Sequence, residues 1–388
     1  MQVPHSVDIL IVGAGPAGLA LGSELLRRGV PCLIADAQAA GANTSRACVV
    51  HARTLEVLEP LGVVPELVAR GIEVPIFRVR DRDRALLSVD FRSLPSRYPY
   101  TLMLPQADTE SILLAAFQAR GGRVLRPCRM TEMRASMAGA TVTLRDHDGE
   151  HVVHTRYLIG CDGMHSAVRE QSGIAFVGGS YQEGFALADV HMDWPLSREE
   201  VNLFYSPAGL MVVAPLPQQR FRVVATIKEA PALPSAADVQ ALLDARGPSG
   251  GVARVTHLVW SSRFHIQHRV ARTFRSGRTL ILGDAAHVHS PAGGQGMNTG
   301  IQDAISLGAA LTAARDRGVD RELSDWAQRR QRVARNVVRL TDRLTRTATI
   351  ESHAGQALRN AILRLAGHVP GVRRAIAMRL SELSQRAA

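Results

Sequence analysis

The stretch VDILIVGAGPAGLA, residues 7–20, decides the fold of this chain. Its apolar run over 7–12 ends at a glycine and predicts a strand. Helical spacing follows over 17–28 and stops at Gly29, and a second short apolar run, residues 32–35, predicts another strand. Strand, helix and strand together take about 30 residues, the length of a βαβ unit. The chain therefore starts as an α/β protein.

A glycine-rich turn, Gly13-Ala14-Gly15-Pro16-Ala17-Gly18, joins the first strand to the helix. In such a turn the first glycine permits the tight bend, the second lets a pyrophosphate approach the backbone, and the third lets the helix pack closely. The phosphates then face free N–H groups at the helix N-terminus. Asp36 ends the second strand, where an acid can accept a ribose hydroxyl. The pattern predicts a dinucleotide site, although it does not separate FAD from NAD, and a glycine turn of another α/β protein is the alternative.

Two later motifs place an acid beside glycine after an apolar run. The first, GCDGMHSAVR (160–169), contains Asp162 and Gly163, and Asp-Gly is also common in plain surface turns. The second, GDAAHVHSPAGGQGMNTG (283–300), delivers Asp284 to a strand end and exposes backbone N–H groups before a helix predicted from about Ile301. That helix N-terminus can stabilise negative charge on a reduced flavin.

The rest of the chain divides around these motifs. We predict a helix over 108–120 that is capped by Asp108, a hairpin turn at Asp148-Gly149, strands over 210–216 and 221–227, and a helical, arginine-rich tail from about Asp320. With 388 residues the chain is long enough for two domains. We predict a discontinuous nucleotide-binding domain (1–75, 101–180 and 275–330), a β-rich substrate domain (76–100 and 181–274) and C-terminal helices (331–388).

Composition narrows the possible partners. The formal net charge is +11, which can favour nucleic acid or an acidic membrane surface. However, Lys228 is the sole lysine, and the scattered arginines lack interleaved aromatic residues that would stack bases. We interpret the charge as a bias toward arginine and expect no nucleic-acid partner.

Cysteine usage and hydropathy point to the cytoplasm. Cys32, Cys48, Cys128 and Cys161 form no CxxC pair, so we expect neither a metal site nor a disulfide framework. The N-terminus has no basic segment or cleavage site of a signal peptide, and no apolar run approaches the roughly 20 residues of a spanning helix. We therefore predict a cytoplasmic protein without stable membrane insertion.

Together the three motifs resemble those of class A flavoprotein monooxygenases, the p-hydroxybenzoate hydroxylase group, over nearly the whole chain. Residues 45–56, Pro105-Gln106 with Glu110, and 380–383 resemble the phenol and polyketide hydroxylase branch. The resemblance implies a Rossmann-like FAD-binding domain of the glutathione-reductase type, an inserted β-sheet substrate domain and a C-terminal helical segment. It also implies bound FAD, NADPH or NADH as co-substrate, and hydroxylation of a small aromatic substrate with O2 through a flavin C4a-hydroperoxide.

The resemblance carries flavin or pyrophosphate contacts onto specific positions. Besides Gly13, Ala14, Gly15, Gly18 and Asp36 of the first motif, these positions are Arg46, Gln106, Asp162, Gly163, Asp284, Pro291, Gly296, Met297 and Asn298. Arg46, whose charge would steady an anionic ring, and Pro291, near the isoalloxazine, are the candidate catalytic residues. The family often has Glu where this chain has Asp36. Many members of the branch carry a thioredoxin-like C-terminal domain, which we do not expect here, so monomer and homodimer both stay open.

The substrate side is less defined. We predict a substrate surface on the inserted sheet through Phe204, Tyr205, Met211 and Val213, for which ordinary sheet core is the alternative. Candidate bases that could ionise a phenol are His51, His191, His265 and His287, although a lone histidine is more often structural.

Three other functions are compatible with parts of the sequence. A flavin-dependent halogenase would use an early lysine and a Trp-x-Trp motif, whereas Trp194, Trp260 and Trp326 are isolated here. A non-oxygenating FAD oxidoreductase of the same fold is the main alternative. A nucleic-acid binder would leave all three motifs unexplained.

Overall fold

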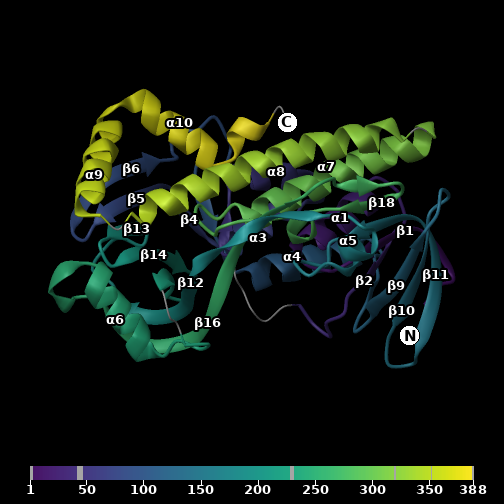
Figure 1. Cartoon of the computed structure of the whole chain (residues 1–388), viewed down its shortest axis with the longest axis horizontal. Helices are drawn as coiled ribbons and strands as arrows, with labels where there is room; N and C mark the ends of the chain where they lie inside the picture. Colours follow the sequence, from purple (N-terminus) through teal and green to yellow (C-terminus); the bar gives the residue numbers. More distant parts are fainter. Residues whose placement is uncertain (1–2, 42–46, 228–230, 319, 351, 387–388) are drawn as a thin grey trace.

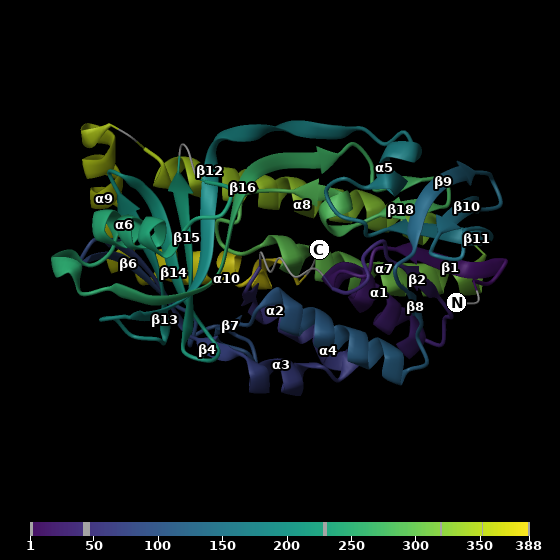
Figure 2. The same cartoon turned by 90° about the horizontal axis from the view of Figure 1, so that it is seen from below.

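The structure is a computed structural model, and it describes residues 3–41, 47–227, 231–318, 320–350 and 352–386, with the side chains of 181–183 and 265–266 excepted. Figures 1 and 2 show an elongated molecule with one large sheet toward each end. Long helices run beside both sheets. The nucleotide motifs and the predicted substrate strands therefore belong to different ends of the same molecule.

The first sheet contains the predicted βαβ unit. Strand β1 (Ser6–Val12) pairs in parallel with β2 (Leu33–Ala35) and with β11 (Glu150–Gly160), so that Val12 lies opposite Ala35 and Gly160. Helix α1 (Pro16–Arg27) connects β1 to β2. The remaining strands of this sheet are β8 (Val124–Leu125), β9 (Arg129–Ala135), β10 (Ala140–Arg145), β17 (Arg275–Ser276) and β18 (Thr279–Ile281).

The second sheet is mostly antiparallel and is built around two long strands, β12 (Phe176–Asp193) and β16 (Arg254–Ala271). It includes the predicted pair, which forms β14 (Gly209–Leu216) and β15 (Arg220–Ile227). Its other strands are β5 (Ile76–Asp81), β6 (Arg84–Asp90), β13 (Glu200–Ser206) and β19 (His287–Val288). A small third sheet holds β3 (Val49–Val50), β4 (Ile72–Val74) and β7 (Thr101–Met103).

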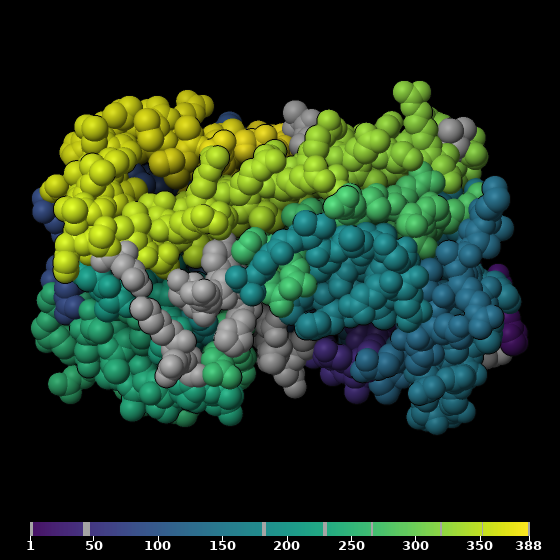
Figure 3. All heavy atoms as spheres, in the orientation of Figure 1, coloured from purple at the N-terminus to yellow at the C-terminus, as the bar shows by residue number. Residues whose placement is uncertain are grey.

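Helices cover both sheets. Helix α1 packs against α7 (Gly296–Arg317) and α4 (Gln106–Ala119), and α8 (Arg321–Ala348) packs along α7. Helices α9 (His353–His368) and α10 (Pro370–Leu380) lie on β6 at the end of the molecule that holds the second sheet (Figures 1 and 3). The shorter helices are α2 (Ala52–Leu58), α3 (Val64–Arg70), α5 (Ala167–Gln171) and α6 (Ala236–Arg246).

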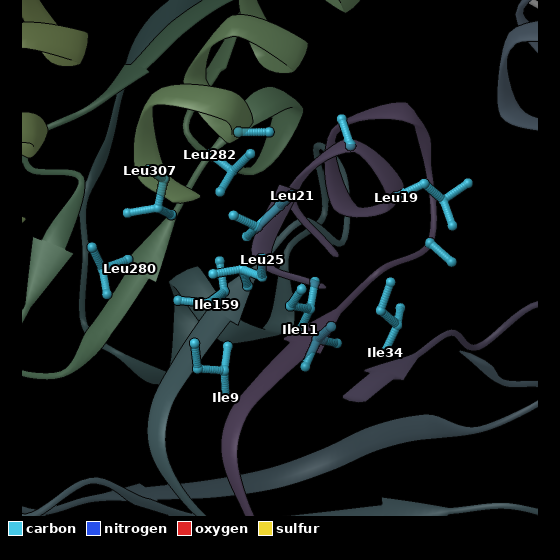
Figure 4. Close-up of a cluster of buried hydrophobic side chains, with 14 of the residues drawn as sticks. Ile9, Ile11, Leu19, Leu21, Leu25, Ile34, Ile159, Leu280, Leu282 and Leu307 are labelled. Atoms are coloured by element: carbon cyan, nitrogen blue, oxygen red, sulfur yellow. The ribbon is translucent and has the colours of Figure 1, made fainter. Parts of the chain in front are cut away.

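The largest core cluster lies between the first sheet and its helices. Ile9 and Ile11 of β1 and Ile159 of β11 are almost fully buried, because parallel strands covered on both faces need apolar side chains on both. They lie close to Leu21 of α1 and Leu307 of α7 (Figure 4). Two further clusters lie on the two faces of the second sheet.

Most local predictions are confirmed, and two helix starts are wrong. Helix α4 begins at Gln106, after the N-cap residue Pro105, so Asp108 lies in the first turn and does not cap it. Helix α7 begins at Gly296 rather than near Ile301. The first N–H groups of a helix need no intrahelical partner, so a helix can start directly after proline or inside a glycine-rich run.

The predicted division into domains stays a prediction. The boundary after residue 180 falls inside β12, and the boundary after residue 330 falls inside α8. Both elements are continuous through these positions. The mixed α/β architecture with C-terminal helices is confirmed.

Candidate flavin site and substrate chamber

The glycine turn after β1 is held closely against β11. Gly13 has φ of +105°, and a Cβ on it would lie 2.3 Å from the Cys161 carbonyl oxygen. A Cβ on Gly18 would lie 2.0 Å from the carbonyl oxygen of Gly13. These two positions therefore require glycine for packing within the protein. Gly15 differs, because a Cβ there would meet no atom within 4 Å.

Asp36 stabilises this turn from the end of β2. Its Oδ2 accepts the Ala14 N–H at 2.6 Å, and its Oδ1 accepts the Gln38 N–H at 2.8 Å. Arg126, which the sequence reading missed, donates from Nη2 to the Ala14 carbonyl at 3.0 Å and lies 3.7 Å from the Asp36 carboxylate. The Nε of Arg126 is buried without a hydrogen-bond partner in the described part of the chain.

Asp162 is engaged within its own motif. It accepts the Ser166 hydroxyl at 2.5 Å and the Val168 N–H at 3.2 Å, at the start of α5. Burial raises the pKa of its carboxyl group. The neighbouring Gly163 has φ of +79°, so the chain turns sharply after β11. Both residues line the same cavity as the glycine turn.

The third motif forms a loop that α7 continues. Asp284, Pro291, Gly296 and Met297 line the cavity. The structure places Asn298 elsewhere, since its buried side chain accepts the His51 N–H and donates to the carbonyls of Val49 and Gly294, all within 2.8 Å. Asn298 therefore holds the loop in shape from behind.

Gln106 and Arg46 complete the predicted nucleotide residues. Gln106 lines the cavity, donates to Glu110 at 2.8 Å, and its backbone N–H donates to the Ala47 carbonyl at 3.0 Å. Arg46 lies outside the residues that the structure describes. Gly18 is near the turn but does not line the cavity, because it packs against Gly13.

These residues fit a dinucleotide such as FAD. No side chain caps α1, whose N-cap is Gly15, or α7, whose N-cap is Gln295. Their first N–H groups thus stay available to phosphate or another electron-rich group in the cavity, and the helix dipoles favour negative charge there. The buried Nε of Arg126 is a further donor that needs an acceptor.

The cavity has a volume of about 910 Å³ and reaches from the glycine turn to the second sheet. At the sheet end its lining is mainly aliphatic and aromatic. The strands contribute Phe77, Val79, Val89, Phe185, Leu187, Leu203, Tyr205, Leu210, Val212, Ala214, Val224 and Phe264, and the C-terminal helices contribute Leu340, Leu344, Leu363, Ile376 and Leu380. We call this end the substrate chamber.

The predicted substrate residues stay a prediction, and the structure places them on two faces of the sheet. Tyr205 lines the chamber, but Met211 and Val213 point to the opposite face of the sheet, where they pack with Phe204 and with Leu243 of α6. Alternate side chains of a strand point to opposite faces, so the cavity-facing residues of β14 are Leu210, Val212 and Ala214. The alternating residues of the sequence predicted that the strand has two faces, but they did not indicate which face lines the cavity.

Of the four predicted histidine bases, the three whose side chains the structure describes, His51, His191 and His287, do not line the chamber. His51 is buried, with Nε2 2.8 Å from the Gly293 carbonyl, and burial lowers its pKa to about 4. His287 lies 2.7 Å from Asp303, which also pairs with Arg330. His191 is paired with His257 at 6.1 Å between ring centroids, and the side chain of His265 is outside the described part.

His289 lines the cavity instead. Its Nδ1 lies 3.0 Å from the Ser290 carbonyl, and only a protonated Nδ1 can donate there, which leaves Nε2 as an acceptor. That Nε2 is buried with no hydrogen-bond partner among the described residues. Burial, with a contribution from His287, lowers the pKa of His289 to about 4, so the ring is neutral at pH 7. Its position within the third motif could have suggested it.

A buried ion pair lies in the cavity wall. Arg222 of β15 pairs with Asp189 of β12 through Nε–Oδ1 and Nη2–Oδ2 contacts of 2.7 and 2.8 Å, and its Nη1 donates to the Ala47 carbonyl at 3.1 Å. Arg222 is 1% exposed and Asp189 is 5% exposed. A single charged residue inside an apolar strand was the only sequence signal for this pair.

The fold and the cavity define a class: an α/β protein with one dinucleotide cleft that opens into an apolar chamber on a second sheet. Residues 6–341 match the model of the FAD binding domain family. The chain belongs to this family.

Relatives and solved structures place it more closely. It is 37% identical over 370 residues to 6-methylpretetramide 4-monooxygenase of Streptomyces rimosus, a match that covers 92% of this chain and 64% of the relative. It is 33% identical over 318 residues to pentachlorophenol 4-monooxygenase of Sphingobium chlorophenolicum, a match that covers 77% of this chain and 57% of the relative. It therefore spans less than two thirds of either relative.

Among solved structures, the OxyS anhydrotetracycline hydroxylase of Streptomyces rimosus has a TM-score of 0.82 at 31% identity, covering 97% of this chain and 76% of that one. The p-nitrophenol 4-monooxygenase PnpA of Pseudomonas putida DLL-E4 has a TM-score of 0.89 at 22% identity, covering 99% and 100%, and shows the fold alone. These comparisons confirm the predicted resemblance to flavin-dependent aromatic hydroxylases and FAD as the cofactor.

Proposed function

We propose that this protein is an FAD-dependent monooxygenase that uses NADPH or NADH and O2 to hydroxylate a phenol-like or polycyclic aromatic substrate. The observation that carries the proposal is the single cavity that joins the glycine turn to the apolar chamber. A flavin bound to the three motifs would lie in the same cavity as an aromatic ligand bound in the substrate chamber, so the two could come into contact inside the protein. The relatives named above are monooxygenases of aromatic compounds, which supports the same reading.

The motif residues would bind and orient the cofactor. Gly15, the backbone of Ala14 and Arg126 would hold the adenosine and pyrophosphate part, with Asp36 keeping the turn in place. The other proposed contacts are Gln106, Asp162, Gly163, Asp284, Pro291, Gly296 and Met297, with Arg46 and Pro291 nearest the reacting ring. Gly13, Gly18 and Asn298 would act through the shape of the turn and the loop.

The chamber would position the substrate and exclude water. When bound, the flavin supplies the activation of oxygen, which is chemistry that side chains cannot perform. Aliphatic walls from β13, β14 and the C-terminal helices favour an apolar, flat ligand. The Nε2 of His289 is a neutral acceptor that can take a hydrogen bond from a substrate hydroxyl and so fix which ring carbon faces the cofactor.

The first test is oxidation of NADPH and NADH by the FAD-loaded protein, with and without a panel of phenols and polycyclic phenols. We expect one ligand class to accelerate oxidation and to yield a hydroxylated product that carries oxygen from 18O2. Acceleration without incorporation would favour the alternative, a non-oxygenating FAD oxidoreductase. A protein that takes up no FAD would refute both.

The cellular location and the oligomeric state of the protein belong to the same proposal. We propose a cytoplasmic protein that acts as a monomer or homodimer on a small aromatic substrate, without nucleic acid and without stable membrane insertion. The four cysteines are all free, which supports a reducing compartment.

A further inference from the structure

The outward face of α9 and the start of α10 expose an aliphatic stripe. Its members share large apolar side chains and high exposure, and they are Leu358, Ile362, Leu365, Val369 and Val372. On α9, Leu358, Ile362 and Leu365 recur every three or four residues, the spacing that puts side chains on one helix face. Val369 and Val372 follow at the junction of the two helices and in the first turn of α10. Leu365 is 70% exposed, a large value for a leucine in a folded chain. We call these five residues the α9–α10 stripe.

The opposite face of α9 is fixed to the protein. Arg359 is buried and donates to the carbonyls of Ala348 and Tyr205, and Gln356 donates to the Ile350 carbonyl at 2.8 Å. A Cβ on Gly367 would lie 3.3 Å from the Leu86 carbonyl oxygen, so the helix lies close on β6. The helix cannot rotate its stripe inward without losing these contacts. In Figure 3 the same segment (yellow) lies at one corner of the molecule, and no other element covers it in that view.

The charged side chains of the two helices themselves have one sign. From His353 to Leu380 the sequence has no Asp or Glu, and it has five arginines: Arg359, Arg364, Arg373, Arg374 and Arg379. Arg373, Arg374 and Arg379 are exposed on α10. An exposed aliphatic face on helices that carry arginines and no acids is the pattern of helices that lie in the surface of an anionic bilayer, with apolar groups among the acyl chains and cations at the headgroups.

Two other occupants suit these features less well. A second copy of the chain on the same face would bring two cationic surfaces together, because a two-fold interface joins identical surfaces. A nucleic acid would account for the arginines but not for five exposed aliphatic side chains. None of the helices within the described ranges is long and apolar enough to cross a bilayer.

We propose that the α9–α10 stripe docks this protein onto the surface of a membrane that contains anionic phospholipid. The same two helices supply Leu363, Ile376 and Leu380 to the wall of the substrate chamber. The docked face would thus lie directly over the chamber, where an apolar ligand dissolved in lipid would meet the protein. The docking itself does not depend on the proposed chemistry.

Cosedimentation of the FAD-loaded protein with vesicles tests the proposal. We expect binding to vesicles of equimolar phosphatidylcholine and phosphatidylglycerol, weaker binding to pure phosphatidylcholine, and loss of binding as salt rises. Arg373→Glu/Arg374→Glu should weaken binding at least about 30-fold, since each cation near an anionic surface contributes roughly fivefold. Ile362→Ser/Leu365→Ser should weaken it about tenfold or more, because apolar burial is lost.

Matched controls separate this face from general charge and hydrophobicity. Arg321→Glu/Arg329→Glu makes the same change in net charge on α8, and Leu233→Ser replaces a leucine that is 73% exposed elsewhere. Both should bind as the parent does. Equal binding to both vesicle types, or parent-like binding by the α9–α10 variants, would overturn the proposal. So would a dimer in solution that Ile362→Ser/Leu365→Ser converts to a monomer, since the stripe would then be an interface between copies.

Discussion

The carboxylate of Asp36 and the backbone N–H of Ala14 lie 2.6 Å apart, a hydrogen bond between the end of β2 and the glycine turn after β1. The acid expected to bind a ribose therefore also shapes the loop that would hold the phosphates. Asp36 is a shorter acid than the Glu common in the family, and its length suits this contact with the backbone. One residue would thus couple loop geometry to cofactor binding.

Replacing Asp36 should weaken FAD binding clearly while changing the free energy of unfolding only a little. We expect Asp36→Ala to raise the Kd for FAD by about 10-fold or more, because hydrogen bonds to a charged group contribute roughly 1.5–3 kcal/mol. Fluorescence titration of the apoprotein with FAD measures this. Asp90→Ala, an exposed acid on β6, is the control. An unchanged Kd for Asp36→Ala would contradict the role given to this carboxylate.

Gly13 and Gly15 should respond differently to alanine. Gly13→Ala puts a Cβ 2.3 Å from a carbonyl oxygen at positive φ, so we expect misfolding or a large loss of stability. Gly15→Ala meets no atom of the protein, so the chain should fold with an unchanged melting temperature but bind FAD poorly. Thermal unfolding of the apoprotein and flavin absorbance of the loaded protein report the two effects. Normal FAD binding by Gly15→Ala would mean that no pyrophosphate approaches there.

Replacing only one partner of the Arg222–Asp189 pair should lower the free energy of unfolding strongly. Arg222→Met leaves a buried carboxylate without its partner, and we expect the free energy of unfolding to fall by about 3–5 kcal/mol. Arg222→Met/Asp189→Leu should recover most of that loss. Urea denaturation measures both, with Arg92→Met of the exposed Arg92–Asp90 pair as the control, where we expect almost no change. A loss for the double variant as large as for Arg222→Met would show that the pair is not the cause.

Adjacent residues of β14 should separate ligand binding from stability. Val212→Phe narrows the chamber, so we expect a higher KM for bulky ligands with little change in unfolding. Val213→Phe overfills the core beneath α6, and we expect a loss of about 1–3 kcal/mol with an unchanged KM. Steady-state NAD(P)H oxidation and urea denaturation give the two readouts. The reverse outcome would place the chamber on the other face of the sheet.

Glu382 should make stability fall as pH rises. It is buried against Gln302 and Thr299, and burial raises its pKa to about 8, above the value of about 4.3 for an exposed glutamate. Between these values the folded state keeps a proton that the unfolded state has lost. The free energy of unfolding therefore has its full contribution from this group below about pH 4.3 and loses up to about 1.4 kcal/mol per pH unit toward pH 8.

The variant Glu382→Gln removes this titration. We expect its free energy of unfolding, relative to the parent, to rise with pH across that range and to level off above pH 8. Glu132→Gln, at an exposed position of β9, should show a constant difference from the parent. A constant difference for Glu382→Gln as well would mean that the carboxyl group is ionised in the folded state.

Local patterns alone were enough for the nucleotide half of the molecule. Apolar runs, helical spacing and glycine positions describe neighbouring residues, and they correctly located β1, α1, β2 and the ends of β11 and β18. The family resemblance added the cofactor and the positions around Asp284 and Gln106. Where helices begin was less certain, because α4 and α7 start directly after proline and within glycine-rich sequence, where no side chain marks the cap.

The sequence by itself thus determined the fold class, the cofactor motifs and the alternation of the substrate strands. Only the tertiary structure decided which face of β14 lines the cavity, that Arg222 pairs with Asp189 33 residues away, and that Asn298 supports the loop by donating a hydrogen bond to the Val49 carbonyl. The physical reason is the distance along the chain over which each kind of interaction acts. Propensity and turn geometry act between neighbours in the chain, whereas the sides of a sheet and the partner of a buried charge depend on which distant segments pack together.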